Sequence, residues 1–447
     1  MPEERKQYYQ GAVALLVLGA LARFPMMIVL RRGPALVYWD FSYLQAAQAI
    51  LRGDFHALGL RVPVYPLLIV LCGLSPLALW FAQSILGLAA SWMIFDMAFR
   101  RTRHSLWSLL IALVCSLTPE VLEYESSMMS EALTGFLLVA SLWLITRDEH
   151  AGENNIRYPL GLGLTIALAG LTRPLMIALV PVYYCFLVPL GPPARLLQRV
   201  TLRRTLLFSL PVIVFISAWC SFNYVNSGYF TPTTFTGGNL MDQVNPYVHL
   251  APERFALVRD AWLKSRRVIT NPDNRNACLV FEDAAAEIER KTGKTKAQVT
   301  HDYALLARYL QIHHPLLCLR RAEQGWMQFW GEPTRDETEW PQESNVALGE
   351  FGMTLINFLV REIEAAFLVL ALLSLPCAMV YRKAFVKHEY LIFASVLWVS
   401  VFAAFTEYGE NRRFCVPFYA LIVYTLMTRA WQWITAASME KTPLSSN

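Results

Sequence analysis

The sequence predicts an all-α polytopic membrane protein. Of its 447 residues, 55% are hydrophobic and only 16% are charged, whereas soluble domains carry roughly 25% charged residues. Apolar stretches long enough to cross a bilayer recur along most of the chain. Only helices and closed barrels satisfy their backbone hydrogen bonds in lipid, and a barrel would instead show short alternating segments. These continuous runs therefore favour helices.

The apolar runs predict about ten or eleven transmembrane helices. They cover residues 11–30, 79–99, 105–118, 131–146, 158–171, 174–190, 204–221, 363–381, 389–406 and 414–433. The first run is longer than the apolar region of a cleaved signal, so we expect an uncleaved signal anchor. Residues 64–74 are apolar but short and flanked by prolines, which favours a re-entrant or interfacial helix.

Charge predicts the orientation. Basic loops near Arg5, Arg100, Arg147, Arg195 and Arg382 alternate with less basic ones, and basic loops stay in the cytoplasm. Residues 31–78, 119–130, 222–350 and 406–413 are then extracytoplasmic. The net charge of +5 comes from such loops and does not indicate nucleic acid. We expect a multi-pass inner-membrane protein whose active site faces the periplasm or the cell exterior.

Three parts follow from this orientation. Residues 1–221 form an N-terminal transmembrane module that contains the first outer loop, 31–78, and residues 351–447 form a C-terminal one. Between them, 222–350 is a mostly helical extracytoplasmic segment. Helical patterns occur near 252–266, 278–292 and 296–330, and an amphipathic helix is predicted at 41–52.

No phosphate-binding glycine loop or dinucleotide motif occurs, so we expect no nucleotide cofactor. Nucleotide-activated donors are absent outside the cytoplasm, and a transferase there needs a membrane-borne donor such as a polyprenyl-phosphate sugar. Such a site needs cations for the phosphate and one base for the acceptor hydroxyl.

Asp40 is the candidate base, because one carboxylate can deprotonate a hydroxyl during attack on the anomeric carbon. Tyr38 and Trp39 flank it and could shape a sugar subsite. The alternative is that Asp40 only caps the helix that follows. Pattern alone leaves both interpretations open.

Glu131, after Ser130, opens a predicted span on the same side. It is either an ordinary first-turn acid or a second acid of the site, which orients the acceptor or ligates a divalent metal. Glu123 and Glu125 are alternatives in the preceding loop. Tyr65 and Glu407 complete the candidate contacts to sugar, acceptor or metal.

Four arginines are candidates for binding the donor phosphate: Arg61, Arg173, Arg412 and Arg413. Arginine presents a bidentate fork to phosphate, and a leaving phosphate gains charge. Outer arginines also oppose the usual charge bias and therefore need an anionic partner. For Arg412 and Arg413 the alternative is a lipid-headgroup anchor or an ion pair with Glu407 or Glu410.

These motifs, in this order, resemble the GT-C superfamily of membrane glycosyltransferases, of the protein mannosyltransferase and aminoarabinose–lipid A transferase type. The residues that carry the resemblance are Asp40, Gly53, Arg61 to Pro66, Ser130 to Leu133, Leu171 to Pro174, and Gly409 to Pro417. Val62 departs from the pattern. No large C-terminal carbohydrate-binding domain follows, so acceptor recognition is expected to fall to residues 222–350.

The resemblance implies a GT-C fold and an inverting glycosyltransferase with a polyprenyl-phosphate-linked donor. Asp40 would be its base, with Glu131, Arg412 and Arg413 in the site. The acceptor would be a hydroxyl on a protein, lipid or glycan at the bilayer surface. Two rival functions remain: a flippase or transporter of lipid-linked sugar, and an oligosaccharide ligase or polymerase with a diphosphate-linked donor.

Overall fold

The computed structural model describes residues 2–31, 41–54, 61–148, 155–187, 199–268, 277–331, 347–380, 385–409 and 411–440. Within these ranges every regular element is a helix. The predicted all-helical class is therefore confirmed.

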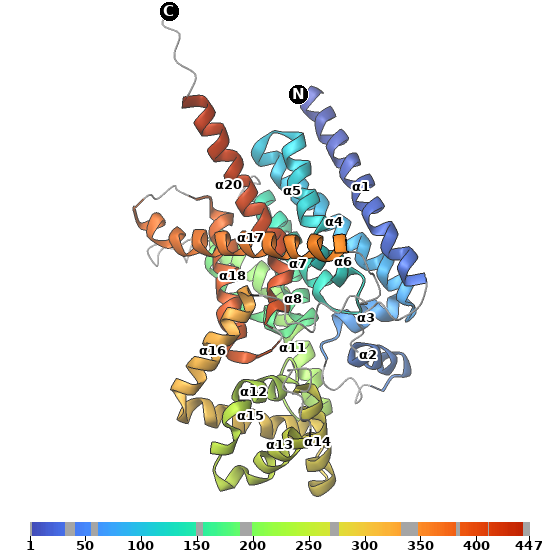
Figure 1. The fold of residues 1–447 in the computed structure, drawn as a ribbon, viewed down its shortest axis with the longest axis vertical. Helices are drawn as coiled ribbons and strands as arrows, with labels where there is room; N and C mark the ends of the chain where they lie inside the picture. The colour runs from blue at the N-terminus through green and yellow to red at the C-terminus, as the bar shows by residue number, and fades with distance from the viewer. Residues whose placement is uncertain are drawn as a thin grey trace, which may run out of the picture.

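The bundle is built from long helices, and short ones join them at its outer end (Figure 1). The long helices are α1 (Pro2–Arg31), α4 (Pro76–Thr102), α5 (Ser105–Leu117), α7 (Glu131–Asp148), α8 (Arg157–Thr172), α11 (Arg199–Ser227), α17 (Ala347–Val380), α18 (Lys387–Thr406) and α20 (Tyr419–Glu440). The 9-residue helix α9 (Leu179–Leu187) also belongs to the bundle. The short ones are α2 (Phe41–Arg52), α3 (Val64–Leu71), α6 (Pro119–Glu125), η2 (Pro174–Ala178), α19 (Arg412–Cys415) and η6 (Val416–Phe418).

Each predicted span overlaps one of these helices. Within the described ranges, four stretches are long and apolar enough to cross a membrane: Pro76–Thr102, Thr201–Ser227, Lys387–Thr406 and Arg412–Ala436. A fifth is possible if α5 and α6, which bend by 56° at their junction, form one broken span. The chain is thus a multi-pass membrane protein, and α3, with 8 residues, is too short to cross.

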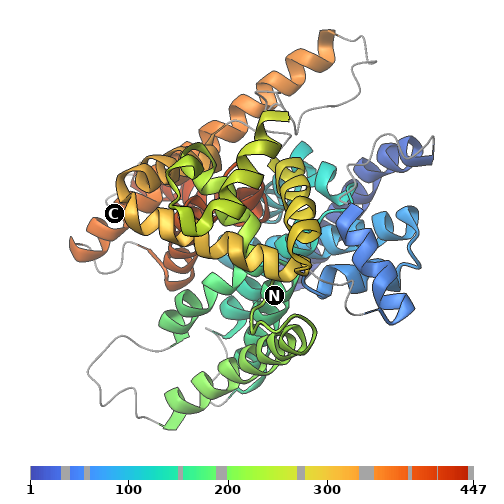
Figure 2. The ribbon, with the colours of Figure 1, turned by 90° about the horizontal axis from the view of Figure 1, so that it is seen from below.

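Residues 236–330 form a separate unit, called here the outer unit. It contains α12 (Thr236–Val244), η3 (Asn245–Leu250), η4 (Glu253–Phe255), α13 (Ala256–Val268), α14 (Ala277–Thr292), α15 (Lys296–His313) and α16 (Pro315–Trp330). Trp262, Phe281 and Tyr303 pack in a core distinct from that of the bundle. The unit lies at the end of the bundle opposite the two chain termini (Figure 1), and its α12 and α16 contact α18 (Figure 2).

Prolines set two helix boundaries, because proline lacks the N–H that a helix interior needs. The predicted break at Thr172–Pro174 is present between α8 and η2. The helical pattern predicted over 296–330 is confirmed as two helices, because α15 ends at His313 and α16 begins at Pro315. The predicted amphipathic helix at 41–52 is confirmed as α2.

Candidate active site at the outer end of the bundle

Glu131 is the first residue of α7 and is only 1% exposed. Its Oε1 accepts a hydrogen bond from Nε of Arg413 at 2.9 Å and lies 3.1 Å from a terminal guanidinium nitrogen of Arg173. Its Oε2 is buried and has no hydrogen-bond partner among the described residues. One oxygen thus holds two arginines while the other remains available to a donor.

The two arginines reach Glu131 from different parts of the chain. Arg413 lies in α19, and Arg173 caps the C-terminus of α8 in an extended conformation enforced by Pro174. The Arg173 guanidinium stacks 4.4 Å from the centre of the Phe414 ring. Two guanidinium groups that converge on one carboxylate form an arrangement that suits an anionic ligand.

Arg412 points elsewhere, because adjacent residues of a helix differ in direction by about 100°. It is 2% exposed and pairs with Glu120 at 2.9 Å and with Glu364 of α17. Its partners are therefore neither Glu407 nor Glu131. This guanidinium is occupied by two carboxylates and ties α6, α17 and α19 together.

The first outer loop packs against the start of α7. The Tyr43 hydroxyl of α2 donates to Oγ of Ser130 at 3.2 Å. The rings of Tyr43 and Tyr65 pack edge to face with their centres 4.9 Å apart. The Tyr65 hydroxyl donates in turn to Oε1 of Gln83 at 2.9 Å. Gln83 then donates to the backbone oxygens of Glu125 and Ser127. A chain of buried hydrogen bonds thus fixes α2 and α3 beside Glu131.

Arg61 lies between the first outer loop and the outer unit. Its Nε donates to Oγ of Ser42 at 2.7 Å, and its guanidinium carbon is 4.4 Å from the Tyr43 ring centre and 5.5 Å from that of Phe235. Glu407 accepts a bond from Nδ2 of Asn239 in α12 at 3.2 Å. Both residues thus face the junction with the outer unit.

Tyr38, Trp39 and Asp40 lie outside the described residues. Asp40 directly precedes Phe41, the first residue of α2, and is three residues before Tyr43. The role of Asp40 as the base therefore stays a prediction.

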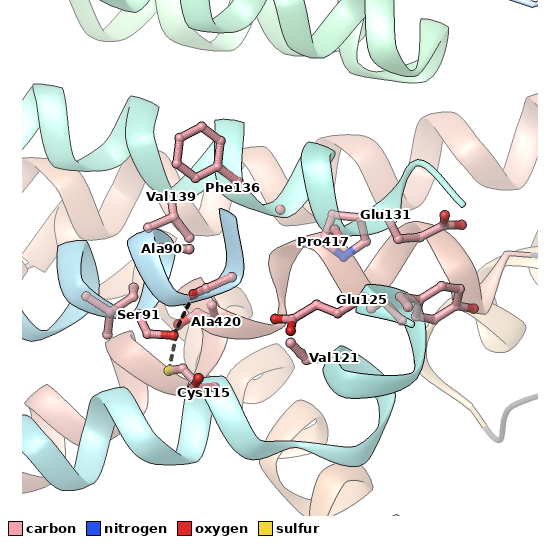
Figure 3. A pocket seen from close by; sticks show the side chains of 17 residues that line it. Ala90, Ser91, Cys115, Val121, Glu125, Glu131, Phe136, Val139, Pro417 and Ala420 are labelled. Carbon is pink, nitrogen blue, oxygen red and sulfur yellow. Dashed lines mark hydrogen bonds between the residues drawn. The ribbon is translucent and has the colours of Figure 1, made fainter. Parts of the chain in front are cut away.

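A cavity of about 60 Å³ lies behind Glu131, between α4, α5, α6, α7 and η6. Figure 3 shows the Glu125 side chain extending toward the side of Ser91 and Cys115, whereas the Glu131 carboxylate points away from that side. Glu125 is paired through both oxygens with Arg23 of α1 at 2.6 Å. Both oxygens of Glu125 are therefore engaged, whereas Oε2 of Glu131 has no hydrogen-bond partner among the described residues.

The described residues do not fit a metal at Glu131. They contain no group of three or more histidine, cysteine or carboxylate side chains placed to hold an ion. The nearest charged groups to Glu131 are two guanidinium cations, which compete with a metal for the same oxygen. The divalent ion stays a prediction, and no chemical step below depends on it.

Several residues of this network were not singled out from sequence. Arg23 and Glu364 lie inside apolar stretches, where an ionisable group signals a buried partner. That signal could have identified both. Gln83 and Tyr43 carry no such signal, because a neutral polar residue inside a span is common.

One comparison with known proteins agrees with the resemblance over part of the chain. Residues 61–219 match the family model described as dolichyl-phosphate-mannose-protein mannosyltransferase. No curated protein matches the chain.

Among solved structures, ArnT from Cupriavidus metallidurans bound to undecaprenyl phosphate aligns at 15% identity with a TM-score of 0.35, over 94% of this chain and 78% of that one. Its apo state aligns at 14% identity with a TM-score of 0.32, over 95% and 76%. The resemblance to membrane glycosyltransferases that was recognised from motifs is confirmed by the family model over residues 61–219.

Proposed function

We propose that this chain is an inverting glycosyltransferase. It moves a sugar from a polyprenyl-phosphate donor to a hydroxyl acceptor at the extracytoplasmic face of the membrane. The observation that carries the proposal is the arrangement at Glu131, where two arginines share one carboxylate oxygen next to the helix that follows Asp40. The family match over residues 61–219 supports it.

The Asp40 carboxylate accepts the proton of the acceptor hydroxyl, and the oxygen attacks the anomeric carbon of the sugar. The bond from that carbon to the phosphate oxygen breaks, and polyprenyl phosphate leaves with one more negative charge. Arg413 and Arg173 stabilise this charge as it develops. Inversion follows because the acceptor attacks from the face opposite the leaving group.

Glu131 has two tasks in this scheme. Through Oε1 it orients both guanidinium groups, and through Oε2 it accepts a hydrogen bond from a hydroxyl of the sugar or the acceptor. A buried carboxylate oxygen without a donor costs about 1–3 kcal/mol. A ligand that supplies a donor recovers this free energy on binding.

The test uses purified protein, synthetic polyprenyl-phosphate pentoses and hexoses, and an envelope extract that supplies acceptors. Mass spectrometry follows the release of polyprenyl phosphate and the mass added to the acceptor. We expect Asp40→Asn to abolish turnover at an unchanged melting temperature. Asp54→Asn, at an exposed acid of the same outer loop, is the matched control and should remain active.

Full turnover by folded Asp40→Asn would show that another group is the base. Movement of labelled lipid across vesicles without sugar transfer would favour the transporter. Turnover only with diphosphate-linked donors would favour the ligase or polymerase.

A further inference from the structure

The segment that leads to Arg413 is clamped by the outer unit. From α12, Nε2 of Gln243 donates to the backbone oxygen of Glu407 at 2.6 Å and to that of Ala404. From α16, Oε1 of Gln328 accepts from the backbone N–H of Gly409 at 3.2 Å. Helices far apart in sequence from this loop therefore set its backbone path.

Asn411 is the innermost part of this clamp and is 0% exposed. Its Nδ2 donates to the backbone oxygen of Gly325 in α16 at 2.9 Å and to that of Glu407 at 3.3 Å. Its own backbone oxygen accepts from the N–H of Phe414 at 3.1 Å. Asn411 thus bonds the outer unit with its side chain and starts the turn of α19 with its backbone.

Gly325 leaves no spare room at this contact. A Cβ at position 325 would lie 2.5 Å from Nδ2 of Asn411, closer than real Cβ contacts come, and 3.4 Å from the backbone oxygen of Ala404. A Cβ at this position must therefore displace the Asn411 amide, which is bonded to the backbone oxygen of Gly325 and precedes the turn at 411–414. Arg413 lies in that turn, and its Nε is bonded to Glu131.

We propose that Asn411 is a positioning residue through which the outer unit sets the place of Arg413. It touches no reacting atom in this scheme and acts only by holding the turn. The role deepens the proposed function and rests on it, because Arg413 is there the ligand of the donor phosphate. Through Asn411 the outer unit also acts on the site, because the packing of α16 against α18 determines the position of the Arg413 guanidinium.

The test compares Asn411→Ala and Gly325→Ala with Gly161→Ala. Gly161 is also a helical glycine, but its added Cβ would meet only the Leu144 side chain at 3.4 Å, an ordinary contact. Polyprenyl phosphate without sugar is the probe for binding. We expect the first two variants to bind it about tenfold more weakly, equivalent to ~1.4 kcal/mol, and to have a lower kcat, because Arg413 also stabilises the charge of the leaving phosphate. Gly161→Ala should match the unchanged protein.

Repeating the substitutions in an Arg413→Ala background separates positioning from general damage. If Asn411 acts through Arg413, they weaken binding no further there, whereas independent effects add. Additive effects would overturn the proposal. Should Gly325→Ala fail to fold, Asn411→Ala, which introduces no clash, decides the question, and unchanged binding by that variant would overturn it.

A second readout does not depend on the ligand. An Arg413→Cys variant is labelled with a charged, membrane-impermeant thiol reagent, and the rate at position 413 is followed by peptide mass spectrometry. Adding Gly325→Ala should change this rate several-fold, and adding Gly161→Ala should not. If the labelling rate changes but the protein binds no polyprenyl phosphate, the positioning role is supported and the proposed polyprenyl-phosphate donor is wrong. An unchanged rate would overturn the positioning role.

Discussion

Two buried carboxylates, Glu389 near the chain termini and Glu131 at the outer end, are each held by two arginines, but their hydrogen bonds differ. At the end near the chain termini, Glu389 accepts from Arg101 and Arg429 and from the backbone N–H of Val386, so both oxygens are satisfied. The Asp96 carboxylate there accepts from Tyr8, Trp143 and Arg147 and forms an ion pair with Arg100. At the outer end, Glu131 leaves Oε2 without a described partner.

This contrast separates structural ion pairs from a binding site. A buried charge whose hydrogen bonds are all made stabilises one arrangement of helices and offers nothing to a ligand. A buried charge with an open acceptor costs stability until a donor arrives, so such a group needs an explanation, and at Glu131 we propose a ligand. Burial and charge alone do not distinguish Glu389 from Glu131 as a candidate binding site.

The largest expected effect comes from neutralising each acid in turn. Glu389→Gln should lower the unfolding free energy by ~3 kcal/mol because it leaves two arginines without their charge partner, while turnover per folded molecule stays within about twofold. Glu131→Gln should lose less stability, because only one of its oxygens is bonded, but should reduce turnover at least ~100-fold. Thermal unfolding in detergent and the sugar-transfer assay measure the two quantities. If both variants lose stability and activity in parallel, the distinction between Glu389 as a structural acid and Glu131 as a ligand-binding acid is wrong.

The next effect separates two neighbouring arginines. Lysine lacks the bidentate fork, so Arg413→Lys should raise KM for the donor by about tenfold. Arg412→Lys should instead lower the melting temperature, because one ammonium cannot replace a guanidinium that contacts both Glu120 and Glu364. Steady-state kinetics on both variants decide the matter. If Arg412→Lys raises KM more than Arg413→Lys does, the assignment of the donor phosphate to Arg413 is wrong.

The sequence predicted the helical segments well and their contacts less well. Apolar length and proline breaks gave the helices, because both act locally. The pairing of Glu131 with Arg413 joins residues 282 positions apart, and only the shared predicted side of the membrane suggested it. Which of two adjacent arginines faces the site depends on helix phase in a 4-residue helix, and no periodicity can be read from so short an element.

A smaller effect tests the hydrogen-bond chain that supports the outer end. Tyr65→Phe removes the hydroxyl that donates to Gln83 and leaves the buried Oε1 of Gln83 without this hydrogen bond. The unfolding free energy should fall by about 1–2 kcal/mol, and turnover should decrease. Tyr183→Phe removes a comparable buried hydroxyl that bonds Ser141, whose own hydroxyl keeps a bond to the Leu138 backbone. Its cost should be lower, with normal turnover. Equal losses in unfolding measurements would mean that the chain through Gln83 has no special role.

The smallest effect extends the comparison to an exposed pair. In the outer unit, hydrogen bonds from Lys264 and Lys291 lower the pKa of Glu287 to about 2. An acid whose pKa is depressed by folding stabilises the folded state above its unfolded pKa, and this contribution disappears as pH falls toward 2. Glu287→Gln should therefore reduce the stability of the outer unit slightly at pH 7 and not at pH 2. Both lysines are well exposed and water screens the pair, so the difference should stay small. Thermal scans of the two proteins across this pH range measure this difference in stability. A loss of stability as large as that of Glu389→Gln would mean that burial does not explain the strength of the ion pairs of Glu389.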